Sequence, residues 1–138
     1  MSWRARSRML AAALAAAAVG TSMALSTTGE VWTWGENDTG QLGNGSTVEH
    51  RRRPEPVRLP AGARVREITG GASGDLALTT RGMILAWGGN DFGELGIGKV
   101  SRGSRIPVAV RLGAGRIAVH IGTGWDSSNA LAITRSRR

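Results

Sequence analysis

One twelve-residue stretch of this chain occurs twice, and this repetition constrains the possible folds more than any other feature. The run Trp-Gly-Glu-Asn-Asp-Thr-Gly-Gln-Leu-Gly-Asn-Gly at 34–45 returns at 87–98, with eight of the twelve positions identical and a constant offset of 53 residues. Internal periods of a few tens of residues are typical of solenoids and propellers. The sequence therefore predicts stacked copies of one small unit.

Each copy of the unit is expected to hold about four short strands and no helix. Alternating apolar and β-branched residues favour strands, and Gly29 and Gly82 supply the positive φ of tight hairpin turns. The Pro-Val runs are expected to form edge strands, where the missing proline N–H is tolerated. The expected strands are 22–27, 31–34, 56–59 and 65–69 in the first copy, and 75–80, 83–87, 107–110 and 117–121 in the second.

A glycine-rich loop follows each Trp-Gly pair. The Asn-Asp pairs at 37–38 and 90–91 are expected to cap their own backbone in Asx turns. Leu42 and Leu95 are expected to anchor the loops as buried apolar side chains. Because the aspartates recur at equivalent positions, they are interpreted as turn formers rather than as a catalytic pair.

The formal charge of +8 is concentrated near the chain ends. Six of the 18 basic residues lie in 4–8 and 135–138, which leaves 12 basic residues against 10 acidic ones in the rest of the chain. The repeat region is therefore close to neutral, and nucleic acid is not an expected partner. The absence of cysteine excludes disulfides, a thiolate nucleophile and a cysteine metal site. No cofactor is expected.

The first 18 residues have the composition of an export signal. Arginines precede an apolar, alanine-rich run at 9–19, which is followed by small residues. The run is too short to span a membrane as a helix, which needs about 20 residues. The alternatives are an apolar leader that is not cleaved, or a start codon inside a longer reading frame. The expected location is extracytoplasmic, or cytoplasmic if the start is internal.

His50 and His120 are where acid–base chemistry would begin, because histidine titrates near neutrality. Neither has an evident catalytic partner in the sequence. His50 is expected in a solvated loop, and His120 is expected as a packed or half-exposed strand residue. We therefore predict no catalytic, cofactor or metal site.

The run Gly-Glu-Val-Trp-Thr-Trp-Gly at 29–35, followed by Gly-Gln-Leu-Gly at 40–43, resembles the repeats of the regulator of chromosome condensation family. The resemblance covers roughly 18–134. It implies a propeller of seven blades, each a four-stranded sheet. Two features depart from that family: only about two repeats are present, and Gly74-Asp75 and Trp125-Asp126 stand where a small residue and a histidine are usual.

The expected fold is therefore all-β: a partial β-propeller of about two four-stranded antiparallel blades plus the start of a third. We divide the chain into a leader (1–18), units at about 19–70, 71–121 and 122–134, and a basic tail (135–138). Uncovered blade faces and sheet edges favour self-association or partial unfolding.

Family members act mostly by binding proteins through the loops of one propeller face, so the resemblance implies a non-enzymatic protein-binding segment. Within that class, the family's activities include nucleotide exchange on a small GTPase with chromatin binding, and inhibition of a secreted enzyme such as a β-lactamase. The alternatives are a truncated remnant, or an accessory module of a larger enzyme or propeller. The candidate contact residues are Glu36, Thr39, Arg51, Arg52, Arg53, Phe92, Trp125 and Asp126.

Overall fold

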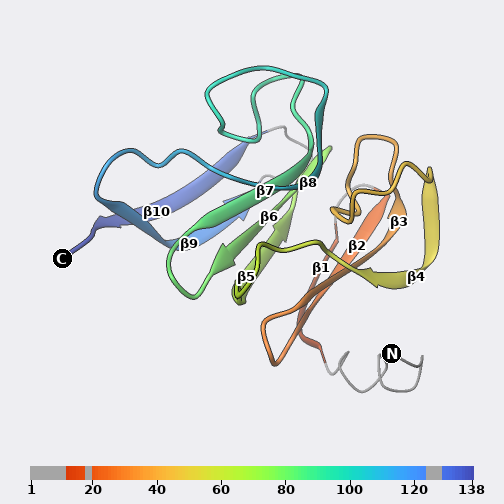
Figure 1. The fold of residues 1–138 in the computed structure, drawn as a ribbon, viewed down its shortest axis with the longest axis horizontal. Coiled ribbons are helices and arrows are strands. Elements are labelled where there is room, and N and C mark those ends of the chain that lie inside the picture. Colours follow the sequence, from red (N-terminus) through yellow and green to blue (C-terminus); the bar gives the residue numbers. More distant parts are fainter. Residues whose placement is uncertain (1–11, 18–19, 124–128) are drawn as a thin grey trace.

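The computed structural model describes residues 12–17, 20–123 and 129–138, and in these ranges the chain forms ten β-strands and no helix (Figure 1). The described part therefore also contains no helix of the length and apolarity needed to cross a membrane. The strands are β1 (Ala12–Ala17), β2 (Thr21–Ser26), β3 (Val31–Glu36), β4 (His50–Pro56), β5 (Val65–Gly70), β6 (Gly74–Thr79), β7 (Ile84–Gly89), β8 (Gly103–Ala109), β9 (Arg116–Thr123) and β10 (Ala130–Ser136).

The strands form three antiparallel sheets, which we call blades. Blade 1 has the order β1-β2-β3-β4, blade 2 has the order β5-β6-β7-β8, and blade 3 contains β9 and β10. Because every strand pairs with its neighbour in sequence, each blade is a simple meander. Two complete blades and the start of a third confirm the predicted all-β partial propeller.

The blades and the sequence repeats are out of phase. Blade 1 covers 12–56 and blade 2 covers 65–109. The first strand of each blade therefore lies before the predicted unit that contains the rest of that blade. In blade 1 this first strand is β1, which lies in the predicted leader and pairs with β2 through Ala15↔Ala24 and Ala17↔Ser22.

The outermost strands lie earlier in the chain than predicted. The expectation of edge strands at 56–59 and 107–110 was wrong in position, since β4 ends at Pro56 and β8 ends at Ala109. β4 pairs with β3 from Glu36↔His50 to Trp32↔Pro56, so the charged segment 50–55 forms the edge of the sheet. Val57 then leaves the sheet and is buried in the core.

The molecule has two distinct ends. The long loops that follow Trp-Gly, 37–49 and 90–102, lie at one end, which we call the loop end (Figure 1). The hairpin turns at 27–30 and 80–83 lie at the opposite end, together with the connections between blades. We call this the turn end. The same backbone hydrogen bond joins the blades there twice: the N–H of Val65 donates to the carbonyl of Gly29 (2.9 Å), and that of Ala118 donates to Gly82 (2.9 Å).

The core lies between blades rather than inside one of them. One cluster joins blade 1 to blade 2 and includes Met23, Leu25 and Trp87, while a second joins blade 2 to blade 3 and includes Leu76 and Leu78. A blade with apolar side chains on both faces must be covered on both sides. Among the described blades, blade 2 is covered on both faces, by blade 1 on one side and by blade 3 on the other.

Candidate protein-contact surface

A buried asparagine organises each Trp-Gly loop. The side-chain amide of Asn37 donates to the carbonyls of Ser46 (2.9 Å) and Val48 (2.7 Å), and its oxygen accepts the N–H of Leu42 (3.1 Å). Asn90 repeats the pattern with Lys99, Ser101 and Leu95. Because a buried amide with these partners has one geometry, each loop is held in a single conformation.

The local turn is capped by a different residue from the one predicted. Gln41 accepts the N–H of Thr39 through its side-chain oxygen (2.9 Å), and Glu94 accepts that of Phe92 (2.9 Å). The Asx-turn expectation for Asn37 was therefore wrong, since its oxygen bonds the N–H five residues ahead. The expectation that Leu42 and Leu95 anchor the loops is confirmed, because both are buried.

The first loop is also bound to the next blade. The indole N–H of Trp87 donates to the carbonyl of Gln41 (2.8 Å), and Arg105 donates to the carbonyl of Ser46 (3.0 Å). Gly43 has a φ of +61°, and a Cβ there would lie 2.9 Å from the Trp87 ring. The loop is thus clamped between its own blade and blade 2, which makes it a rigid platform.

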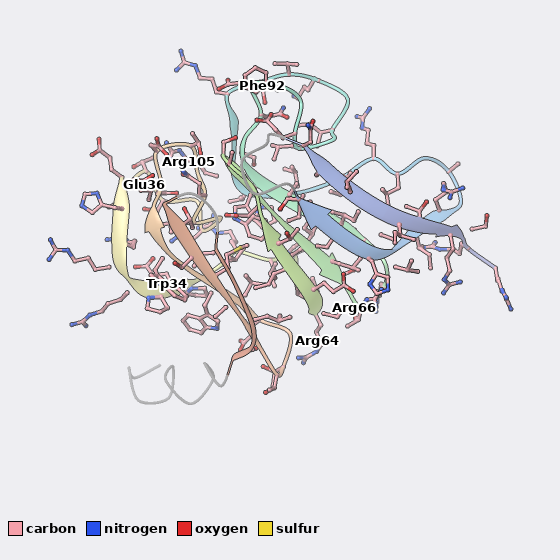
Figure 2. The ribbon with its side chains drawn as sticks, turned by 180° about the vertical axis from the view of Figure 1, so that it is seen from behind. Trp34, Glu36, Arg64, Arg66, Phe92 and Arg105 are labelled. Atoms are coloured by element: carbon pink, nitrogen blue, oxygen red, sulfur yellow. The ribbon has the colours of Figure 1, made fainter. Side chains whose placement is uncertain are left out.

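Three predicted contact residues lie at this loop end. Phe92 is 80% exposed at the tip of the second loop, and Glu36 is exposed at the end of β3. Figure 2 shows both at the same end of the molecule as Arg105. Thr39 is half-buried, and its hydroxyl donates to the carbonyl of Ser73 in blade 2 (3.1 Å). Thr39 is therefore engaged in blade packing, whereas Phe92 and Glu36 are accessible.

The three arginines predicted as contact residues lie on a strand. Arg51, Arg52 and Arg53 belong to β4, the outer edge of blade 1, and Arg51 pairs with Glu55 (3.1 Å). Charged residues at an exposed edge discourage pairing with other strands. His50 is exposed at the start of β4 instead of in a loop. The two other candidates, Trp125 and Asp126, lie outside the described residues.

The structure pairs His120 with a partner that the sequence analysis did not identify. Its Nδ1 lies 2.8 Å from a carboxylate oxygen of Glu67, whose other oxygen accepts the N–H of Ile121 (3.1 Å). Glu67 and His120 are 53 residues apart, one full repeat, because the first strands of neighbouring blades lie side by side. The repeat offset was the available signal for this contact.

Asp75, which departs from the usual family pattern, is a second residue whose surroundings the sequence did not predict. It is buried on β6, opposite Trp87 in the strand register, and neither carboxylate oxygen has a hydrogen-bond partner in the structure. Burial raises the pKa of Asp75 well above its usual range. The repeat-equivalent position in blade 1 is Ser22, which shows that the fold does not need a carboxylate there.

No cluster of three or more histidine, cysteine, aspartate or glutamate side chains that could hold a metal occurs in the ranges that the structure describes. The described features at the loop end are rigid loops, buried asparagines and one exposed aromatic ring. These are features of a surface that presents side chains for contact.

The meander blades, the core between blades and the asparagine-centred loops define a β-propeller repeat protein. The model of the regulator of chromosome condensation (RCC1) repeat matches residues 28–78 and 81–131. The chain belongs to this repeat family, as its sequence resemblance predicted.

Curated relatives are much longer than this chain. It is 38% identical over 113 residues to the human E3 ubiquitin-protein ligase HERC2, covering 82% of this chain and 2% of that protein. It is 34% identical over 110 residues to the mitochondrial RCC1 domain-containing protein RUG3 of Arabidopsis thaliana, covering 80% of this chain and 24% of that protein. The chain thus spans a quarter or less of these relatives.

Solved structures show the same fold. Human WBSCR16 has a TM-score of 0.74 at 25% identity, over 91% of this chain and 31% of that one. Yeast RCC1 (Prp20), solved bound to Kap60, has a TM-score of 0.75 at 20% identity, over 88% of this chain and 30% of that one. The described blades therefore superpose on about a third of these larger proteins.

Proposed function

We propose that this chain is a non-enzymatic, protein-binding propeller segment whose contacts are made by its loop end. The observation that carries the proposal is Phe92, an aromatic ring 80% exposed on a loop that Asn90 and Leu95 hold in place. Rigid aromatic side chains are enriched among residues that dominate protein interfaces, because they bury a large area at little cost in conformational entropy.

The distribution of repeated and varied positions supports the same proposal. The asparagine, leucine and glycine positions are the same in both loops and serve the fold. Glu36, which corresponds to Gly89 in the second copy, and Phe92, which corresponds to Thr39 in the first, differ between copies and include the accessible side chains. Recognition is therefore assigned to the varied positions, with Glu36 contributing charge and Phe92 contributing apolar area.

The test is site-specific photo-crosslinking in extracts of the source organism. A photoreactive phenylalanine analogue at position 92 should capture one discrete protein, and excess unlabelled chain should suppress the product. The matched control places the same analogue at Ala61, which is exposed at the turn end. Identical products from both positions would refute loop-end recognition.

Proteins in the family suggest which partners to try first. The yeast protein Prp20p has reported binding properties toward Gsp1p and histones. The exchange and inhibitor activities of the family add a small GTPase and a secreted β-lactamase to the partners to be tested. Titration of each protein into the purified chain, with Phe92→Ala as the comparison variant, separates these possibilities. A partner whose affinity is the same for both chains does not use the proposed surface.

A second candidate is an accessory blade segment that works only when packed against further blades. Leu131 and Ile133 on β10 are 73% and 62% exposed, and they match the buried Leu76 and Leu78 of blade 2 in the sequence Leu-Ala-Leu/Ile-Thr. Since blade 3 covers Leu76 and Leu78, another blade is the natural cover for their counterparts. In the isolated chain, a second copy can supply it.

Self-association through this face is tested by size-exclusion chromatography with light scattering. We expect the wild-type chain to form oligomers that Leu131→Ser with Ile133→Ser dissociates. The control is Phe92→Ser with Val100→Ser, which removes two exposed apolar side chains from the loop end instead. A monomeric wild-type chain, or equal loss of assembly in both double variants, would exclude this face.

Export remains part of the proposal, and it is supported by the composition of 1–18. Cleavage after residue 18 would remove β1, which pairs with β2 in blade 1. N-terminal sequencing of the protein from its host decides between the two fates of this segment. A mature chain that still begins near residue 1 would reject export by cleavage and keep β1 in the blade.

A further inference from the structure

The arginines of this chain are distributed unevenly between its two ends. At the turn end, two adjoining shallow grooves share Arg81, Gly82 and Ile117, one running toward β9 and β10 and the other toward the end of the chain. Together these grooves are lined by five arginines: Arg66, Arg81, Arg116, Arg135 and Arg137. All five are exposed.

These arginines have no acidic partners among the described residues. Arg66 donates to the carbonyl of Val119 (2.8 Å), and Arg116 donates to the hydroxyl of Thr134 (2.8 Å). The ion pairs Arg51–Glu55 and His120–Glu67 of the described chain include none of the groove arginines. The guanidinium groups of Arg66 and Arg116 are thus held in position while keeping further N–H donors for a ligand.

Few carboxylates offset this charge. The strand directions place two described carboxylates at the turn end: Glu30 beside the first hairpin turn, and Glu67, which is occupied by His120 and the N–H of Ile121. The loop end is more evenly mixed, with the carboxylates Glu36, Asp38, Glu49, Glu55, Asp91 and Glu94 lying among the basic side chains of Arg51, Arg52, Arg58, Lys99, Arg102, Arg105 and Arg111. The near-neutral repeat region therefore carries a strongly basic end. Figure 2 shows Arg64 and Arg66 at the end away from Glu36 and Phe92.

We propose that the arginine-lined grooves at the turn end bind an acidic protein segment, rich in Glu and Asp, on a surface separate from the loop end. Arginine pairs with carboxylates in bidentate geometry, and the apolar floor formed by Gly82, Ile117 and Ala118 suits an extended backbone. A nucleic acid fits less well, since single strands rely on stacked aromatic rings and the described residues place no exposed tryptophan or phenylalanine at this end, where the imidazole of His120 is held by Glu67.

The test uses the full chain and fluorescence anisotropy, with a labelled synthetic peptide of alternating Glu and Gly as the probe. We expect binding that weakens as salt increases, because the contacts are exposed ion pairs. Arg81→Gln with Arg135→Gln should weaken the affinity roughly fivefold, since each exposed pair contributes about a factor of two and the two factors multiply. Within the described residues neither side chain makes a hydrogen bond or an ion pair, and both are exposed, so the fold should be unchanged.

The matched control is Arg52→Gln with Arg102→Gln, which removes the same charge from exposed positions at the other end. It should change the affinity less than twofold, and unchanged melting temperatures should show that both variants are folded. Equal weakening in the two variants would mean that net charge alone attracts the peptide, and would overturn the proposal. Tighter binding of a DNA duplex than of the peptide at the same salt concentration would also overturn it. Failure at the loop end would leave this result unaffected, because the two surfaces are tested with different variants.

Discussion

Blade 2 and blade 3 carry the same apolar pattern on their second strands, but they bury it to very different extents. Leu76 and Leu78 are 6% and 0% exposed, whereas Leu131 and Ile133 are 73% and 62% exposed. The strands are similar in sequence and in pairing. The difference is that blade 2 has a neighbour on each side, so burial in this fold is a property of the boundary between blades.

The largest expected effect comes from truncating matched side chains on the two blades. Leu78→Ala should lower the free energy of unfolding by about 3 kcal/mol, because it leaves a cavity between blades 2 and 3. Ile133→Ala should change it by less than about 0.5 kcal/mol, since its side chain is exposed. Urea unfolding at low protein concentration measures both. Equal losses would show that Ile133 is covered in solution.

The packing of blade 2 against blade 1 can be tested at Gly43, where the first loop lies against Trp87. Gly43→Ala should destabilise the chain by about 2 kcal/mol, because it combines a left-handed backbone with a contact 2.9 Å from Trp87. The control is Gly62→Ala, at a φ of +75° with open space around the Cβ position, which should cost about 1 kcal/mol. Thermal unfolding that gives the same loss for both would remove the Trp87 contact from the explanation.

Replacing Asp75 with serine, the residue at the equivalent position of blade 1, should raise the free energy of unfolding instead of lowering it. Asp75→Ser should stabilise the chain by about 1–2 kcal/mol at neutral pH, since a buried group without a partner loses its hydration. The raised pKa of Asp75 means that the folded state holds its proton more tightly than the unfolded state. The contribution of Asp75 to stability is therefore greatest below the unfolded value of about 3.9, and it is lost as the pH rises through the folded value.

The gain from Asp75→Ser should accordingly shrink as the pH falls toward 4. Denaturation curves across the acid range measure this change. A gain that stays constant with pH would mean that Asp75 remains charged in the folded chain, through a partner that the structure does not show.

The smallest expected effect concerns the contact between the first strands of blades 2 and 3. Glu67→Gln should cost about 0.5 kcal/mol, because the amide can still accept the N–H of Ile121 but loses its charge beside the exposed His120. His120→Gln in the same background should then add little. A double-mutant cycle measures the coupling, and a coupling above about 1.5 kcal/mol would mean that the pair is shielded from solvent.

Much of the blade could be predicted from the sequence, because it depends on local patterns. The hairpins around Gly29 and Gly82 and the buried leucines of the loops follow from turn chemistry and periodicity. The position of the outer strands could not be predicted in this way. The charged sequence of β4 does not favour a strand, and β4 forms one because it pairs with β3.

The site was less predictable, because its geometry depends on contacts between repeats. His120 gave no sign of Glu67, and Asp75 looked like an ordinary polar residue before the strand register placed it in the blade 1–blade 2 boundary. The arginines of the turn end are dispersed over 66–137 and meet only when β5, β9 and β10 are assembled. Their overall charge was visible in the sequence, but their position was not.

The asparagine-centred loops also have a kinetic consequence. The hydrogen bonds of Asn37 join residues 5 to 11 positions apart, whereas the bonds of Trp87 and Arg105 to that loop join residues 46 to 68 apart. Short-range closures cost less chain entropy and form faster than long-range ones. Each loop should therefore form together with its own hairpin, and the docking of one blade against the next should be the slow step of folding.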